Sequence, residues 1–188
     1  MARSTVRAVL LGAPGSGKGT QAELLARSLE IPAISTGEML RLAVSQGTEL
    51  GDRVKGTMAS GGLVDDGLMS EVVRERLTLD DARGGFLLDG YPRTIQQAAT
   101  LDSLLERDGG ALNAVVLLEV PEGVLVRRAV ARRRADDREE VVRERLRVYH
   151  EKTEPLVEHY ERRGLLRRVD GNREIGDVTA GILVALRG

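Results

Sequence analysis

The glycine-rich segment at residues 12–21, GAPGSGKGTQ, constrains the fold more than any other part of the sequence. It follows a continuous apolar run at 6–11, typical of a strand buried on both faces, and precedes helical spacing at 21–29. In this context backbone N–H groups wrap closely around phosphate, and the start of the helix adds its positive end. Lys18 adds a mobile cation for the terminal phosphates of a nucleoside triphosphate. The alternative, a glycine-rich turn with a surface lysine, leaves the combination of strand, spacing and helix unexplained.

Apolar runs recur at residues 85–88, 114–120 and 165–169, separated by charged stretches with helical periodicity. Such alternation predicts an α/β fold with a parallel sheet. A chain of 188 residues without repeats or a long polar linker fits one domain.

Two segments are expected to be insertions between strands. Residues 35–64 begin STGEMLR, where Ser35 or Thr36 is placed to cap a helix and Glu38 to complete a capping box. The basic stretch 131–137 leads to a long helix that begins near Arg138. Pro155 predicts a kink or a division in that helix. The predicted packed face of the helix consists of Val142, Leu146, Tyr149, Thr153, Leu156 and Tyr160.

Composition excludes several classes of partner. The net charge of -1 and an aromatic content of 2% argue against nucleic acid, which requires basic excess and stacking surfaces. The absence of cysteine excludes disulfides and thiolate metal sites, so we expect no structural zinc and a cytoplasmic setting. Residues 1–15 hold too short an apolar run for a signal peptide, and no run is long enough to span a membrane.

The loop differs from the general phosphate-binding pattern because Gly19 separates Lys18 from Thr20. GKGTQ at this point resembles the loop of the adenylate kinases and their nucleoside monophosphate kinase relatives. The resemblance covers essentially the whole chain. It implies the three-layer P-loop NTPase fold with a five-stranded parallel sheet, in which 35–64 is the NMP-binding segment and 131–137 a short lid. The implied ATP-binding residues of the loop are Gly15, Ser16, Gly17, Lys18, Gly19 and Thr20.

An acceptor site is implied by two further segments. STGEMLR resembles the AMP-binding segment of the family, which implies base contact for Thr36 and phosphate contact for Arg41. GGLVDDGLM resembles the next element, but Asp65 occupies a position where proline is usual, and we expect it to loosen the turn without changing its contacts. The implied main-chain contacts to adenine and ribose come from Gly62, Leu63 and Val64.

GGFLLDGYPRTIQQA at 84–98 is a second strong match. Asp89 lies where a Walker-B carboxylate belongs, so it should orient the waters of Mg²⁺ rather than bind the ion directly. Arg93 has the planar fork suited to the AMP phosphate, and the resemblance implies that Gln97 reads the adenine edge. A buried strand followed by a capped helix explains the apolar residues but not these three together. The implied AMP site also includes Gly90, Tyr91 and Pro92.

ARRRADDREEVVRERL at 131–146 resembles the shortened lid of compact bacterial adenylate kinases. The resemblance implies that Arg132 covers the ATP base and phosphates, that Arg134 and Arg145 clamp the transferring group, and that Asp136 and Asp137 position these arginines. From the residues alone, the cations have two explanations of equal weight, an anion site or a solvated helix end. The crowded cations are Arg127, Arg128, Arg132, Arg133 and Arg134.

Two positions complete the implied site: Arg128 near the phosphates and Arg173 near the ATP adenine. The resemblance implies an enzyme that transfers a phosphoryl group reversibly from ATP to AMP, giving two ADP in adenine nucleotide homeostasis. It also implies Mg²⁺ as cofactor and a monomer. His150 and His159 fall outside every motif, so no catalytic role is expected for them.

Two alternatives remain open at this stage. One is a kinase for another monophosphate, since UMP and CMP kinases tend to carry alanine in place of Thr36 and asparagine near Gln97. The other is a nucleotide-binding switch or sensor, which would not require the four arginines Arg41, Arg93, Arg134 and Arg145.

Overall fold

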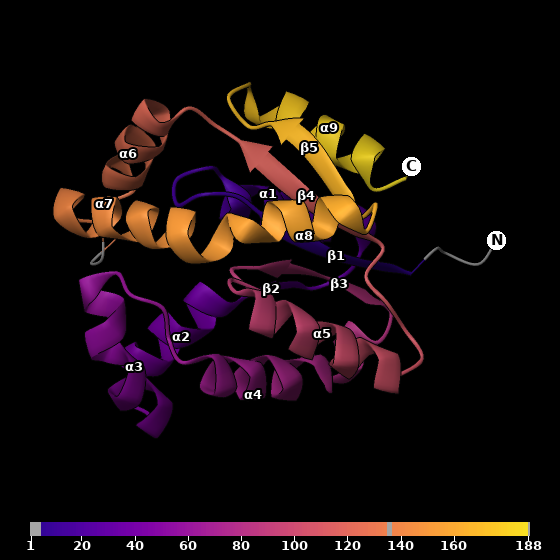
Figure 1. Ribbon diagram of the computed structural model, residues 1–188, viewed down its shortest axis with the longest axis horizontal. Coiled ribbons are helices and arrows are strands. Elements are labelled where there is room, and N and C mark those ends of the chain that lie inside the picture. The colour runs from indigo at the N-terminus through magenta and orange to yellow at the C-terminus, as the bar shows by residue number, and fades with distance from the viewer. Residues whose placement is uncertain (1–4, 135–136, 188) are drawn as a thin grey trace.

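The computed structural model describes residues 5–134 and 137–187 and contains a five-stranded, all-parallel sheet with strand order β2-β3-β1-β4-β5. Val9 of the central strand pairs with Leu88 on one side and with Val115 on the other. The predicted α/β fold with a five-stranded parallel sheet is confirmed (Figure 1). The strands are β1 (Val6–Leu11), β2 (Ala33–Ser35), β3 (Gly85–Asp89), β4 (Ala114–Glu119) and β5 (Leu166–Asp170).

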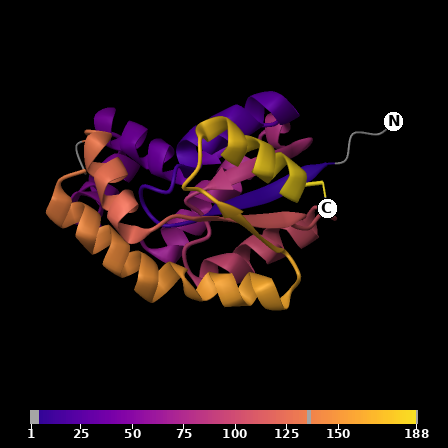
Figure 2. The same cartoon turned by 90° about the horizontal axis from the view of Figure 1, so that it is seen from above.

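Helices cover both faces of this sheet, which makes three layers (Figures 1 and 2). Because neighbouring residues of a strand point to opposite faces, Ala8 and Leu10 pack with α1 and α9 while Val9 and Leu11 pack with α5 and α8. The helices are α1 (Lys18–Leu29), α2 (Thr36–Ser45), α3 (Glu49–Ser60), α4 (Asp66–Leu77), α5 (Ile95–Arg107), α6 (Glu122–Ala131), α7 (Glu139–Val148), α8 (Pro155–Arg162) and α9 (Ile175–Ala185), with a short 3₁₀ turn η1 (Asp80–Ala82) and a π-helical segment η2 (Tyr149–Thr153).

The long helix predicted to begin near Arg138 is divided, as Pro155 indicated. Arg138 caps α7, the π-helical segment η2 follows, and Pro155 is the first residue of α8. The ring of a proline is accepted at the first helical position because the N–H that it lacks has no partner there. All six residues of the predicted face are buried or partly buried, so that prediction is confirmed.

A third cluster, formed by Ala13, Leu125, Ala129, Val142 and Leu146, joins α6 and α7 to the loop after β1. It anchors the base of the helical pair that carries the predicted lid. Among the helices that the structure describes, none is both long and apolar enough to cross a membrane.

Two helix starts differ from the sequence predictions in their side-chain contacts. Ser35 is the N-cap of α2, but its side chain makes no capping bond, because the hydroxyl donates to the Asp89 carboxylate at 3.3 Å. No capping box with Glu38 therefore forms. Asp65 was expected to loosen its turn, yet its carboxylate accepts the Leu68 N–H at 3.0 Å and caps α4.

Candidate functional site

The glycine-rich loop joins the end of β1 to the start of α1, as predicted. Gly15 illustrates why glycine is needed there: its φ is 88°, and a Cβ would lie 2.3 Å from the Leu125 carbonyl oxygen on α6. The loop is thus held tightly between the sheet and α6. Its residues line one part of a large cavity.

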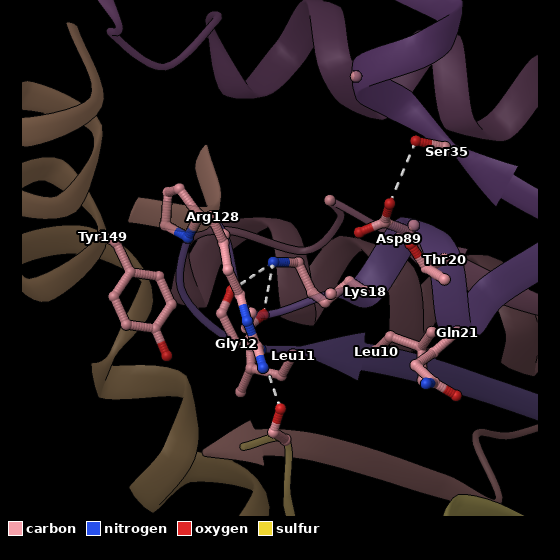
Figure 3. A pocket seen from close by; sticks show the side chains of 18 of the residues that line it. Leu10, Leu11, Gly12, Lys18, Thr20, Gln21, Ser35, Asp89, Arg128 and Tyr149 are labelled. Carbon is pink, nitrogen blue, oxygen red and sulfur yellow. Dashed lines mark hydrogen bonds between the residues drawn. The ribbon is translucent and has the colours of Figure 1, made fainter. Parts of the chain in front are cut away.

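Lys18 is the first residue of α1 and turns back into the loop. Its Nζ donates to the carbonyl oxygens of Gly12 at 2.6 Å and Ala13 at 3.0 Å (Figure 3). Burial lowers the pKa of Lys18 to about 8, with Arg93 among the nearby cations that lower it further, while Asp89 opposes the shift. Because burial disfavours the charged form of Lys18, an anionic partner would stabilise its ammonium group.

The cavity has a volume of about 590 Å³, within the range of pockets that bind organic ligands. Loop residues line one part of it, and arginines from other elements line the rest. A smaller adjoining cavity of about 60 Å³ lies against α2, the end of α3 and the start of α5. The large cavity brings together the predicted residues Gly15, Ser16, Gly17, Lys18, Gly19, Thr20, Arg41, Leu63, Asp89, Gly90, Pro92, Arg93, Arg128, Arg132, Arg134, Arg145 and Arg173, and the smaller one adds Thr36, Gly62, Val64 and Gln97.

Besides Asp137, which is described below, three predicted residues do not line either cavity. The side chain of Tyr91 is 1% exposed and its hydroxyl donates to the Gln97 carbonyl oxygen at 3.2 Å, so it belongs to the core. Arg127 and Arg133 are exposed and line neither cavity. Asp136 lies outside the described residues.

Asp89 ends β3 beside the loop. One of its carboxylate oxygens accepts the Ser35 hydroxyl at 3.3 Å, and a Cβ on Gly19 would lie 3.8 Å from the same oxygen (Figure 3). Oxygen ligands of this type suit a hard cation such as Mg²⁺, which takes one or two carboxylates together with phosphate oxygens and water. Within residues 5–134 and 137–187, no cluster of three or more His, Cys, Asp or Glu side chains could hold a metal by itself. The carboxylate of Asp89 therefore fits an ion that is coordinated mainly by the phosphates of a bound nucleotide.

Arg93 follows the turn after β3 and makes contacts through its side chain and its backbone N–H. Its Nε donates to the Gly90 carbonyl at 2.8 Å, and its backbone N–H donates to Gln97 Oε1 at 2.7 Å. Burial lowers the pKa of Arg93; Asp89 opposes this and Arg41 adds to it. Two neighbouring guanidinium groups in one cavity mark a site for an anion.

Asp137 organises the arginines at the other rim. Its side chain is 1% exposed and accepts from Arg132 at 2.7 and 3.0 Å, from the Arg134 backbone at 2.9 Å and from Arg145 at 3.5 Å. Burial alone would raise the pKa of Asp137, but the hydrogen bonds from Arg132 and Arg134 hold it below its usual value. Arg134 also lies 3.8 Å from Glu38 of α2, so the two rims approach each other.

The remaining predicted cations lie near the start of α9. Arg128 donates to the Gly171 carbonyl at 2.9 Å, and Arg173 pairs with Asp177 at 3.3 Å. Neither histidine lines the cavity; His150 contacts Glu154 and His159 contacts Arg163.

Three further residues that line the cavity, Gln21, Tyr149 and Thr153, were not predicted as site residues. The Gln21 amide donates to the Ile175 carbonyl at 3.1 Å and accepts from Thr179 at 2.8 Å, which ties α1 to the start of α9. The position of Gln21 within GKGTQ was a usable signal. Tyr149 and Thr153 were predicted only as packing residues, and their spacing gave no sign that they also face the cavity.

The comparisons with known proteins all point to the same family. A family model described as adenylate kinase matches residues 10–165. The adenylate kinase of Thermobifida fusca is 49% identical over 186 residues, covering 97% of this chain and 98% of the relative. The adenylate kinase of Xylella fastidiosa strain 9a5c is 50% identical over 185 residues, covering 96% and 99%. Adenylate kinase 1 of Synechocystis is 49% identical over 174 residues, covering 93% of each.

Proposed function

The chain belongs to the adenylate kinase family, and from that premise we propose how its cavity transfers a phosphoryl group between ATP and AMP. One observation carries the proposal: a single cavity holds the phosphate loop together with Arg41, Arg93 and Arg145. A hydrolase or a sensor needs a site for one nucleotide only. A kinase for nucleotides needs a second anion site beside the first, and these arginines supply it.

The donor, ATP, is assigned to the loop side. Backbone N–H groups of residues 15–20 and the start of α1 surround its phosphates, and Lys18 exchanges its loop carbonyl partners for phosphate oxygens. Arg132 covers the base and phosphates from the lid. The ATP base lies toward Arg173, near the start of α9.

The acceptor, AMP, is assigned to the smaller cavity and the rim beside it. Thr36 contacts the base and Gln97 reads its edge, while Arg41 and Arg93 bind its phosphate. Apolar side chains that line this cavity, Leu40, Met58 and Met69, give the base a surface to pack against. The main chain at Gly62, Leu63 and Val64 and the turn at Gly90 and Pro92 complete the site.

Catalysis requires no general base, because the nucleophile is an AMP phosphate oxygen that is already ionised at neutral pH. Positioning and charge neutralisation therefore lower the barrier. Arg134 and Arg145 clamp the transferring phosphoryl group from the lid while Lys18 faces it from the loop. The buried Asp137 holds Arg132 and Arg145 in place for this task. Transfer in either direction interconverts ATP and AMP with two ADP, which serves nucleotide biosynthesis and adenine nucleotide homeostasis.

Mg²⁺ fits this site as cofactor. Bound together with ATP, the ion would withdraw negative charge from the transferring group. Asp89 would orient its water ligands, with the Ser35 hydroxyl fixing the carboxylate. No structural zinc is part of the proposal, since the chain has no cysteine.

The chain is proposed to act as a cytoplasmic monomer of one domain, 1–188, with 35–64 as the NMP-binding segment and 131–137 as the short lid. The contact between Arg134 and Glu38 supports the view that these two segments face each other across the cavity. Closure of both over the substrates would exclude water and suppress hydrolysis of ATP. A cysteine-free composition agrees with a reducing compartment.

Turnover with a panel of acceptors tests the function. Purified protein, Mg²⁺ and ATP are mixed with AMP, CMP, UMP or GMP in turn, and the products are separated and quantified. We expect rapid ADP formation with AMP only. Equal or faster use of a pyrimidine acceptor would assign the chain to another monophosphate kinase activity, and tight ATP binding without any turnover would indicate a sensor.

A further inference from the structure

The amide of Gln97 is held in one orientation by two partners of opposite character. Its side chain is 2% exposed and lines the smaller cavity. Oε1 accepts the Arg93 backbone N–H at 2.7 Å, and Nε2 donates to Asp66 Oδ1 at 2.8 Å. A backbone N–H only donates and a carboxylate only accepts, so the oxygen must face Arg93 and the nitrogen must face Asp66.

Asp66 is itself fixed. It is the first residue of α4, and its second oxygen accepts the Thr94 hydroxyl at 2.9 Å. Thr94 caps α5 by accepting the Gln97 N–H at 3.1 Å, and α4 and α5 lie side by side (Figure 1). Both oxygens of the carboxylate are therefore engaged by the segment that carries Gln97.

The amide keeps one N–H and one oxygen lone pair for a ligand. Their order is set by the protein: the acceptor lies on the Arg93 side and the donor on the Asp66 side. In a pose that places the exocyclic group of the base on the Arg93 side, adenine presents its amino donor there and a ring-nitrogen acceptor beside it, which matches that order. Guanine presents a carbonyl acceptor beside a ring N–H donor, which reverses it.

We propose that Asp66 is a positioning residue that selects adenine over guanine by fixing the orientation of the Gln97 amide; this rests on the proposed function. To pair with guanine in the same place, the amide would have to turn over. Its NH₂ would then face the Arg93 N–H, and its oxygen would face the Asp66 carboxylate. Two hydrogen bonds, one of them to a charged group, would be replaced by two repulsive contacts.

Uracil has the same reversed order as guanine, whereas cytosine has the order of adenine. The amide orientation therefore separates adenine and cytosine from guanine and uracil, and the size of the cavity must separate purines from pyrimidines. A purely structural role for Asp66 would affect all acceptors alike. The role proposed here changes the ratio of GMP to AMP specifically.

The experiment compares Asp66→Ala with the matched control Asp65→Ala, which perturbs the same helix start without touching Gln97. We measure kcat/KM for AMP and GMP, the KM for ATP, and the inhibition constant of GMP against AMP, which reports binding even where GMP is not turned over. In Asp66→Ala the preference for AMP over GMP should fall by about tenfold or more, with the KM for ATP unchanged. In Asp65→Ala the preference should stay within about twofold of the wild type.

Asp66→Leu repeats the test with a branched side chain that accepts no hydrogen bond from Gln97, in case Asp66→Ala does not fold. An unchanged GMP to AMP ratio in every Asp66 variant that folds, or an equal change in Asp65→Ala, overturns the role of Asp66. Turnover of AMP by the wild-type protein is the separate test of the proposed function. An active wild type with an unchanged ratio in the variants thus refutes this inference alone.

Discussion

Replacement of Lys18 by methionine should make the nucleotide-free protein more stable while abolishing its activity. The ammonium lies among Arg93, Arg132 and Arg145 in a largely buried site, and burial is the main reason that its pKa falls from 10.5 to about 8. At neutral pH Lys18 is therefore protonated in the folded protein, although its buried surroundings disfavour the charge. Methionine has a similar length and removes that charge.

The magnitude follows from the size of the shift. A pKa lowered from 10.5 to about 8 corresponds to ~3 kcal/mol of unfavourable free energy in the protonated state. Loss of the hydrogen bonds to the carbonyls of Gly12 and Ala13 offsets ~1–2 kcal/mol of this gain. The free energy of unfolding at pH 7 should thus rise by ~1–2 kcal/mol in Lys18→Met, while turnover falls by about a hundredfold or more.

The difference between wild type and variant should depend on pH in a defined direction. Between pH of about 8 and 10.5 the unfolded state binds more protons at Lys18 than the folded state, so wild-type stability gains relative to the variant as pH rises. The advantage of Lys18→Met is therefore complete below pH of about 8 and disappears by about 10.5. Other titrating groups are common to both proteins and cancel in the difference.

Urea unfolding followed by circular dichroism at pH 7, 8.5 and 10 measures the effect. Lys55→Met is the matched control, because Lys55 is an exposed lysine paired with Asp52 on α3 and its loss should change stability by less than about 0.5 kcal/mol. A Lys18→Met protein that is less stable than the wild type at pH 7 would refute the reasoning. So would a difference that stays constant from pH 7 to 10.

Three further changes test other parts of the site and fold. Arg93→Lys should lower kcat/KM for AMP by about a hundredfold with little change in the KM for ATP, because lysine lacks the planar fork; initial rates with each substrate varied will show this, and unchanged AMP kinetics would remove Arg93 from the acceptor site. Asp137→Asn should lower kcat by tenfold to about a hundredfold through misplacement of Arg132 and Arg145, and steady-state kinetics equal to the wild type would contradict that role. Leu88→Ala, on β3 beside the central strand, should lower the free energy of unfolding by ~2–5 kcal/mol in urea, and a loss below ~1 kcal/mol would mean that the core collapses around the gap.

Most strands were predictable from short runs rich in apolar residues, which are buried in β3 and only partly buried in the edge strand β5. The run at 85–88 became Gly85–Asp89 and the run at 165–169 became Leu166–Asp170, each within one residue at its ends. The strand Ala33–Ser35 escaped prediction. It has three residues, of which only Ile34 is buried, and it pairs on one side only, so it shows no periodicity to detect.

The position of a site residue was predictable where a motif fixes the backbone. Its hydrogen-bond partners were less predictable where a side chain can reach several groups. Strand, loop and helix indicated where Lys18 lies, but not that its Nζ donates to the carbonyl oxygen of Gly12. Glu38 stands at capping-box spacing, yet Ser35 donates to Asp89, which is remote in sequence. Such choices depend on contacts between distant segments, and local spacing does not encode them.

Arg93 links functions that the sequence suggested only separately. Its backbone N–H fixes the amide of Gln97, its guanidinium faces the cavity beside the Gly90 carbonyl, and its own carbonyl accepts the Thr153 hydroxyl at 3.0 Å. Thr153 ends the π-helical segment that continues the lid helix α7. A shift of α7 would therefore act on Arg93, the residue proposed to bind the acceptor phosphate and to orient the amide of Gln97. Thr153→Val, which removes that bond and keeps the volume, should raise the KM for AMP more than the KM for ATP.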